Sequence, residues 1–402
     1  MQVLGVLPLA LLAAATPDPM TRLAASSNAF GFDLYRQLRT EPGNLTFSPA
    51  SITTALAMTW GGARGETAAQ MKQVLHFDGS PDEVMQAAGR LAATLQDPAR
   101  PIVFRIANRL FGEKTCRFEN AYLDATKAAF GASLEPVDFK GAPEASRRLI
   151  NAWVEEKTQD RIKDLVPAGG VTTDTRLALV NALYFLGDWM EPFTKEATRP
   201  EPFFTSAAQK KDVPTMHAAE RFNFALKEGW KALELPYQGG QMSMLLVLPD
   251  GVDGVSALGG SLTAPGLDAI VKALAPARVI VSLPKFEVNA PGSIPLRDFL
   301  VNMGMPVAFD RQRADFTGIA NPPRPDDRLV IGEVFHKAFV KVDEKGTEAA
   351  AATSVVMMRA GAALRPEQPV EFKADHPFLF FIRDQASGMV LFMGRVADPA
   401  AR

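Results

Sequence analysis

The residue types that most often carry chemistry are scarce in this chain of 402 residues. It has four histidines, His76, His217, His336 and His376, and one cysteine, Cys116. No HExxH, GxSxG, Walker or GxGxxG motif occurs, and a single cysteine excludes an intramolecular disulfide and a thiolate-rich metal site. We therefore predict no catalytic residue, no metal and no cofactor. A hydrolase whose catalytic residues lie far apart in the sequence is the alternative.

The charge and the apolar content of the chain indicate which classes of partner to expect. The formal net charge is −2 and there is no dense run of Lys or Arg, so we expect no nucleic-acid partner. Hydrophobic residues make up 47% and charged residues 22%, as in ordinary globular proteins. No segment reaches about 18 uninterrupted apolar residues, so we expect no membrane span. We expect a monomer.

The first 19 residues stand apart from the rest. Val3 to Ala15 is apolar, and Ala13-Ala14-Ala15 resembles the cleavage site of a secretory signal peptide. This predicts an extracellular or periplasmic protein. If translation instead starts at Met20, residues 1–19 are not part of the protein and its location is cytoplasmic.

The segment "DEKGTEAAAATSVVMM" near the C-terminus combines conflicting signals. Alanine-rich residues 348–352 favour a surface helix, whereas residues 354–358 suit a strand. If the whole segment is a strand, side chains alternate between two faces. One face holds Thr347, Ala349, Ala351, Thr353 and Val355; the other holds Gly346, Glu348, Ala350, Ala352 and Ser354. Because Glu348 is costly to bury, the Thr347 face should point inward, and its small residues could slide between existing strands.

The elements around this segment predict one interleaved α+β domain. Helical periodicity or helix-start signals occur over 25–38, 48–61, 65–77, 119–131 and 144–160. Strand patterns occur over 101–113, 175–189, 231–237, 242–249, 277–288, 328–343, 377–384 and 388–396. Helices dominate the first half and strands the second, without regular βαβ alternation.

Several long motifs resemble the serpin family. They are "NLTFSPASITTALAMTWGGARGETAAQM", "LVNALYFLGDWMEPF", "LPKFEVNAPGSIPLRDFLVNMGM", "FHKAFVKVDEKGTEAAAAT" and "ADHPFLFFIRDQASGMVLFMGRVADP". The resemblance extends from about Ala25 to Pro399, and the lack of disulfides and of a basic cluster resembles bacterial serpins. It implies a single serpin-like domain over 22–400, with three β-sheets, eight to nine helices and an exposed reactive-centre loop at about 344–370.

The resemblance also implies a function, that of a suicide substrate for serine endopeptidases. The protease cleaves the loop, and the loop then inserts into the central sheet and traps the acyl-enzyme. The loop hinge matches Glu344, Lys345, Gly346, Thr347, Glu348, Ala349, Ala350, Ala351, Ala352 and Thr353. Residues matching those that control sheet opening are Ser48, Ser51, Asn181, His336, Trp189 and Lys285, the last of which matches a partner of Glu344.

The scissile bond has two candidate positions. The family's usual hinge length, counted from Glu344, places it at Ala360-Gly361, which suits an elastase-like or subtilisin-like protease. Arg359-Ala360 is the alternative and would suit a trypsin-like protease. The segment that follows is longer than in common family members, which leaves both positions open. Two other functions are a non-inhibitory serpin, acting as carrier, chaperone or storage protein, and a cysteine protease inhibitor.

Overall fold

A computed structural model describes residues 17–401 except 132–133, 290–291, 325–326 and 348–367, and omits the side chains of 105–108, 179, 181 and 182. The described residues contain nine α-helices. These are α1 (Pro19–Leu38), α2 (Pro49–Gly61), α3 (Gly65–Val74), α4 (Pro81–Leu95), α5 (Asn120–Phe130), α6 (Pro143–Lys157), α7 (Val255–Ser261), α8 (Ala264–Ala273) and α9 (Arg297–Asn302). Short 3₁₀ helices occupy Lys195–Ala197 and Val307–Phe309.

The strands of the described residues form three sheets. A six-stranded sheet has the order β10 (Phe286–Asn289), β13 (Phe339–Val342), β14 (Gly346–Thr347), β4 (Leu177–Asp188), β2 (Val103–Glu113) and β3 (Leu134–Val137). A two-stranded sheet pairs β11 (Ile294–Pro295) with β12 (Phe335–His336).

The third sheet has nine strands. Its order is β1 (Leu45–Phe47), β17 (Val390–Val396), β16 (Phe378–Asp384), β8 (Met242–Pro249), β7 (Trp230–Pro236), β6 (Gln209–Lys227), β9 (Ala275–Pro284) and β15 (Val370–Lys373), with β5 (Arg199–Ser206) paired to β6. The predicted α+β class, the single domain, the three sheets and the helix number are confirmed.

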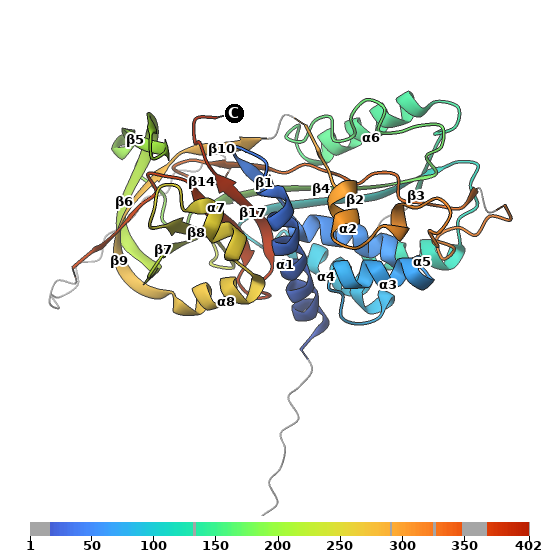
Figure 1. The fold of residues 1–402 in the computed structure, drawn as a ribbon, viewed down its shortest axis with the longest axis horizontal. Coiled ribbons are helices and arrows are strands. Elements are labelled where there is room, and N and C mark those ends of the chain that lie inside the picture. The colour runs from blue at the N-terminus through green and yellow to red at the C-terminus, as the bar shows by residue number, and fades with distance from the viewer. Residues whose placement is uncertain (1–16, 132–133, 290–291, 325–326, 348–367, 402) are drawn as a thin grey trace, which may run out of the picture.

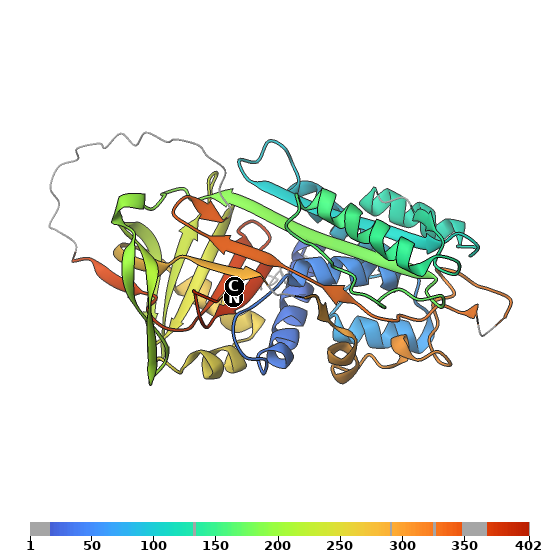
Figure 2. The ribbon, with the colours of Figure 1, turned by 90° about the horizontal axis from the view of Figure 1, so that it is seen from above.

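The six-stranded sheet lies between helices, and Figures 1 and 2 show its long strands β2 and β4 running below α6. On the opposite face α2 packs on β4 and α4 packs on β2. Helix α2 begins where the sequence predicted, because the Ser48 side chain accepts a hydrogen bond from the Ser51 backbone N–H and Pro49 occupies the first turn. The helix is buried almost all round, so it forms the floor beneath the sheet.

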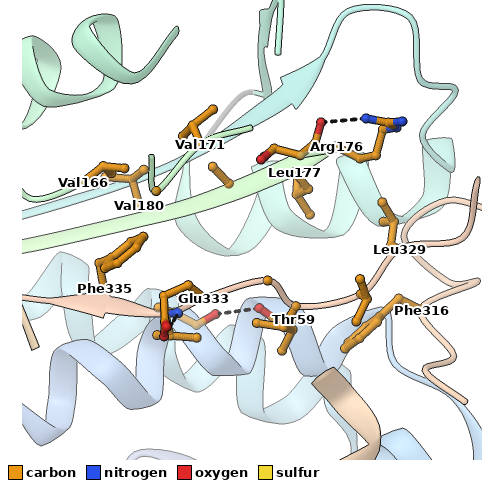
Figure 3. Close-up of a pocket in the computed structure, with 18 of the residues that line it drawn as sticks. Thr59, Val166, Val171, Arg176, Leu177, Val180, Phe316, Leu329, Glu333 and Phe335 are labelled. Atoms are coloured by element: carbon orange, nitrogen blue, oxygen red, sulfur yellow. Dashed lines mark hydrogen bonds between the residues drawn. The ribbon is translucent and has the colours of Figure 1, made fainter. Parts of the chain in front are cut away.

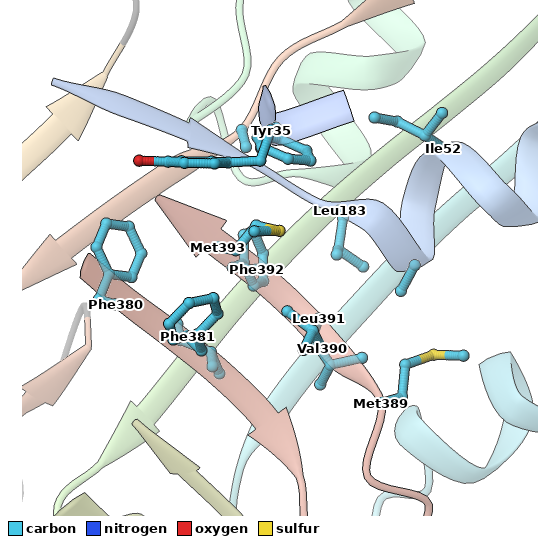
Figure 4. Close-up of a cluster of buried hydrophobic side chains, with 14 of the residues drawn as sticks. Tyr35, Ile52, Leu183, Phe380, Phe381, Met389, Val390, Leu391, Phe392 and Met393 are labelled. Atoms are coloured by element: carbon cyan, nitrogen blue, oxygen red, sulfur yellow. The ribbon is translucent and has the colours of Figure 1, made fainter. Parts of the chain in front are cut away.

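The main core lies between α1, α2 and the end of the nine-stranded sheet. Figure 4 shows Phe380, Phe381, Phe392 and Leu391 from β16 and β17 packed below Tyr35 of α1. Every residue of β16 and β17 is buried, as expected for strands covered on both faces. Helix α2 contacts both β17 and β4, so it connects this core to the six-stranded sheet.

One predicted strand is much shorter than expected. The sequence pattern indicated a strand over 328–343, but the structure has only β12 and β13 there, and residues 328–334 are irregular. Their apolar alternation (Leu329, Ile331) suits a strand, yet these residues line a cavity next to β4. Without a neighbour to complete the ladder, the strand pattern alone does not produce a strand.

Candidate functional site

Two residues of the predicted hinge, Gly346 and Thr347, lie between two strands of the six-stranded sheet. Thr347 is paired with Val342 of β13 on one side and with Gly187 of β4 on the other, and Gly346 is opposite Asp188. Both pairings are antiparallel. The rest of the predicted hinge (Glu348, Ala349, Ala350, Ala351, Ala352 and Thr353) and both candidate scissile bonds (Ala360-Gly361 and Arg359-Ala360) lie outside the described residues.

Thr347 is held by an aromatic pair below the sheet. Its side chain is 1% exposed, and its Oγ1 lies 2.6 Å from the hydroxyl of Tyr237, which is fully buried. The Tyr237 ring stacks on Trp189 with ring centroids 4.6 Å apart. Burial raises the pKa of Tyr237, so the phenol stays neutral and the contact is an ordinary hydrogen bond. Sequence analysis missed Tyr237, although its position at the end of a buried strand was a signal.

Gly346 is required by the close approach of the two backbones. A Cβ atom added at this position would lie 2.0 Å from the carbonyl oxygen of Gly187 and 2.7 Å from the Cα of Asp188. No side chain fits at such distances without moving β4. The glycine therefore allows the segment to enter the sheet at this point.

Trp189 donates two hydrogen bonds to the turn that leads into β14. Its backbone N–H donates to the carbonyl oxygen of Lys345 at 2.7 Å, and its indole Nε1 donates to the carbonyl oxygen of Asp343 at 3.0 Å. Trp189 itself is 1% exposed. The structure thus places Trp189 directly below the point at which the loop leaves the sheet.

Glu344 and Lys285 form the ion pair that the resemblance implied. The Lys285 ammonium donates to the Glu344 carboxylate at 2.8 Å, and the Thr198 hydroxyl donates to its other oxygen at 2.9 Å. Burial alone raises the pKa of the Glu344 carboxyl, but the hydrogen bonds from Lys285 and Thr198 outweigh it, and the pKa lies below its ordinary value. The start of the loop is therefore tied to the neighbouring sheet.

Hydrogen bonds link three of the four residues that match the family's sheet-opening cluster: Ser48, Ser51 and His336. His336 Nε2 accepts the backbone N–H of Ser48 at 3.0 Å, and Ser48 Oγ accepts the backbone N–H of Ser51 at 3.1 Å. The backbone of Asn181 pairs with Asn108, but its side chain lies outside the described ones. These contacts join β12 to the start of α2, so His336 connects the two-stranded sheet to the helix beneath the six-stranded sheet.

His336 makes the stability of the intact protein sensitive to acid. It is 3% exposed, and burial lowers its pKa to about 3. In the unfolded chain the imidazole titrates near its ordinary value of about 6.5, so below that pH the unfolded state binds a proton that the folded state excludes. The free energy of unfolding should therefore decrease as the pH is lowered, by about 2 kcal/mol from pH 7.5 to pH 5.0.

Urea unfolding of the loop-intact protein at these two pH values tests this expectation. His336→Gln should reduce the pH dependence of the free energy of unfolding by about 2 kcal/mol. Equal pH dependence in His336→Gln and the unsubstituted protein would mean that His336 is not the group responsible.

On the edge that faces β13, residues 177–186 of β4 have no paired strand among the described residues. Residues 177–186 of β4 pair with β2, and among the described strands only β14 adjoins the other edge, at Gly187 and Asp188. A cavity of about 210 Å³ lies between β4 and the irregular residues 328–334. Figure 3 shows Leu177 and Val180 of β4 facing Phe316, Leu329 and Phe335 across it. We call the unpaired edge of β4 below β14, together with this cavity, the slot.

Comparison with known proteins identifies the arrangement. The family profile described as Serpin (serine protease inhibitor) matches residues 25–399. The chain belongs to the serpin family. Serpins are protease inhibitors and not enzymes, so the sequence prediction that the protein is not an enzyme is confirmed, as is the predicted family.

Individual relatives agree with this assignment. The chain is 40% identical over 390 residues to a leukocyte elastase inhibitor from Equus caballus, covering 94% of this chain and 100% of the relative. It is 39% identical to Serpin B3 from Homo sapiens, again over 94% and 100% of the two chains. Among solved structures, a cleaved Serpin 42Da is similar with a TM-score of 0.83 and 30% identity, covering 94% of this chain and 99% of that chain.

No helix in the described part of this serpin is both long and apolar enough to span a bilayer. Among the same residues, no group of three or more His, Cys, Asp or Glu side chains is placed to hold a metal ion.

Proposed function

We propose that this serpin traps a serine endopeptidase by inserting its cleaved loop into the slot. The protease serine attacks the carbonyl carbon of the scissile bond, that carbon–nitrogen bond breaks, and the new amine leaves with a proton. The loop residues before the break remain esterified to the protease. If they enter the slot before water hydrolyses the ester, the protease is carried along the sheet and its active site is distorted.

The position of Gly346 and Thr347 carries this proposal. Thr347 already pairs with β13 and β4, Gly346 pairs with β4, and the unpaired edge of β4 continues beyond them. Insertion therefore extends an existing strand and does not need to nucleate a new one. In this scheme Glu344 to Thr353 form the hinge, and Trp189, Lys285, Glu344, His336, Ser48, Ser51 and Asn181 control how readily the sheet opens.

The energy available is large enough for this mechanism. About 15 newly paired residues at ~1 kcal/mol net per hydrogen bond contribute on the order of 10 kcal/mol. A protease domain has a stability of only about 5–15 kcal/mol, so insertion can disorder its active site.

Incubation with a panel of serine proteases, followed by denaturing electrophoresis, tests the proposal. We expect a complex that survives denaturation, because the ester is covalent. Cleavage of the loop by every protease without such a complex would instead favour a non-inhibitory serpin that acts as carrier, chaperone or storage protein. The small side chains of the hinge argue against that alternative. A complex formed only with cysteine proteases would favour the other alternative, a cysteine protease inhibitor.

We propose an elastase-like or subtilisin-like target, with Ala360-Gly361 as the scissile bond. The name of the horse relative, leukocyte elastase inhibitor, supports an elastase-like target. The sequence before the bond, Val355-Val356-Met357-Met358, is apolar, and a small alanine at the bond suits a pocket that excludes bulky side chains.

Mass spectrometry of the C-terminal fragment released from each covalent complex decides between the two bonds. Cleavage at Ala360-Gly361 gives a fragment that starts at Gly361. A fragment that starts at Ala360, together with fast trapping of trypsin, would show that Arg359-Ala360 is the scissile bond and that the target is trypsin-like.

For the compartment, we propose export, with the serpin domain over 22–400 following a signal peptide within residues 1–19. The side chain of Asp18 accepts hydrogen bonds from the backbone N–H groups of Met20 and Thr21, which caps α1. Cleavage after Ala15 keeps this cap, whereas translation from Met20 removes it. The mass of the N-terminal peptide of the protein isolated from its producing cells distinguishes export from the cytoplasmic alternative.

A further inference from the structure

The cavity at the far end of the slot has a largely apolar lining to which three arginines and two acidic residues also contribute. The cavity of about 210 Å³ is floored by Ile52, Ala55 and Leu56 of α2 and walled by Leu177 and Val180 of β4. At 3.3 Å per residue, Leu177 lies about 33 Å along β4 from Gly187, the partner of the last described hinge residue. In the intact protein the described hinge residues therefore do not fill the cavity.

The guanidinium groups of Arg176 and Arg328 line the same cavity. Arg176 donates to the carbonyl oxygens of Thr173 and Thr175. Within the described part of the chain neither Arg176 nor Arg328 forms an ion pair, whereas the third arginine, Arg311, is paired with Asp174 at 2.9 Å. Arg176 and Arg328 also help to lower the pKa of Asp174 and of Asp315. Because Asp174 and Glu333 line the cavity as well, its described lining has three arginines against two carboxylates, and this excess of positive charge favours an anion with an apolar body.

We propose that the far end of the slot binds a small apolar monocarboxylate, such as a medium-chain fatty acid. Its carboxylate would pair with Arg176 and Arg328, and its chain would enter the cavity. A dry cavity of about 150 Å³ holds a benzene molecule, so this larger cavity has room for a short alkyl chain. The charge of the head and the size of the chain together define the ligand class.

Such a ligand would regulate the inhibitor, a consequence that rests on the proposed function. If the antiparallel pairing of Thr347 with Gly187 continues, Val355 comes to lie opposite Leu179 and Met357 opposite Leu177. The loop and the ligand then require the same space. The bound carboxylate blocks the last part of insertion, so the protease hydrolyses the ester and leaves, and the inhibitor becomes a substrate.

Calorimetric titration of the intact protein with sodium octanoate tests the site without any protease. We expect saturable binding of one octanoate per chain, and weaker binding by about tenfold for octanamide and for Arg176→Gln/Arg328→Gln, since both lose the charged pairing. Arg278→Gln, an exposed arginine on β9, is the matched control and should bind octanoate normally. Absence of saturable binding below about 10 mM octanoate overturns the inference.

Loop cleavage locates the site. Protein cut within Val355 to Leu364 by a protease that it does not trap should lose octanoate binding, because the inserted loop occupies the cavity. Equal binding before and after insertion, verified by the increase in thermal stability on cleavage, places octanoate elsewhere and overturns the inference. If cleavage gives no such increase, the proposed function fails, and the arginine variants alone decide the site.

With a protease that is trapped, saturating octanoate should shift the product from covalent complex to cleaved serpin. An unchanged yield of complex at an octanoate concentration that fills the site would overturn the regulatory consequence. If no protease forms a complex even without octanoate, the proposed function fails while the calorimetric result still decides the binding site.

Discussion

Thr347→Arg is expected to convert the protein from an inhibitor into a substrate. Thr347 is 1% exposed and sits against the hydroxyl of Tyr237, above the stacked ring of Trp189. A guanidinium buried in this position would cost about 3–5 kcal/mol. In the intact variant, residue 347 should therefore leave β14 for solvent, and insertion of the cleaved loop would have to bury the charge. The ratio of released to trapped protease should therefore increase by more than about a hundredfold.

The measurement is the residual protease activity after addition of one equivalent of each variant, with the products separated by denaturing electrophoresis. Glu348→Arg is the matched control, because the strand alternation directs residue 348 to the opposite face and the same charge would be solvated there. Loss of inhibition in Thr347→Arg with inhibition kept in Glu348→Arg supports insertion through this position. Unchanged inhibition in Thr347→Arg would refute the insertion mechanism.

Cleavage of the loop within Val355 to Leu364 is expected to increase the melting temperature. A cut releases the hinge, which can then fill the slot. In the intact protein the edge of β4 that faces the slot pairs, among the described strands, only at Gly187 and Asp188. On the order of 10 kcal/mol of new hydrogen bonds, before apolar burial, corresponds to about 10 °C or more for a chain of this length. Most proteins are destabilised or unaffected by such a cut.

Calorimetric or spectroscopic melting of the intact and cleaved forms measures the effect. Thr347→Arg, cut at the same bond, is the internal control: its loop is cleaved, but insertion would have to bury the introduced guanidinium at the top of β14, so its melting temperature should change little. An equal melting temperature before and after cleavage of the unsubstituted protein would show that the intact fold stores no such energy, and the inhibitory function would have to be abandoned.

Much of the fold could be predicted because it rests on local patterns. Ser48 followed by Pro49 specifies the start of α2, and the apolar runs at 377–384 and 388–396 specify β16 and β17, since buried strands need continuous apolar side chains. The small residues from Gly346 to Ala352 similarly indicate a segment that can enter a sheet. The long motifs indicated the family without any knowledge of contacts.

Other features depended on tertiary structure because they join residues far apart in the chain. The contact of Thr347 with Tyr237 spans 110 residues and the bond from Ser48 to His336 spans 288, so neither follows from periodicity. The strand predicted over 328–343 is shortened where its neighbour is missing, and no sequence pattern reports an empty position in a sheet. The sequence by itself predicted which segment inserts, because small side chains alternate along it. The cavity and the arginines that line it depend on the packing of β4, α2 and residues 328–334, which no local pattern reports.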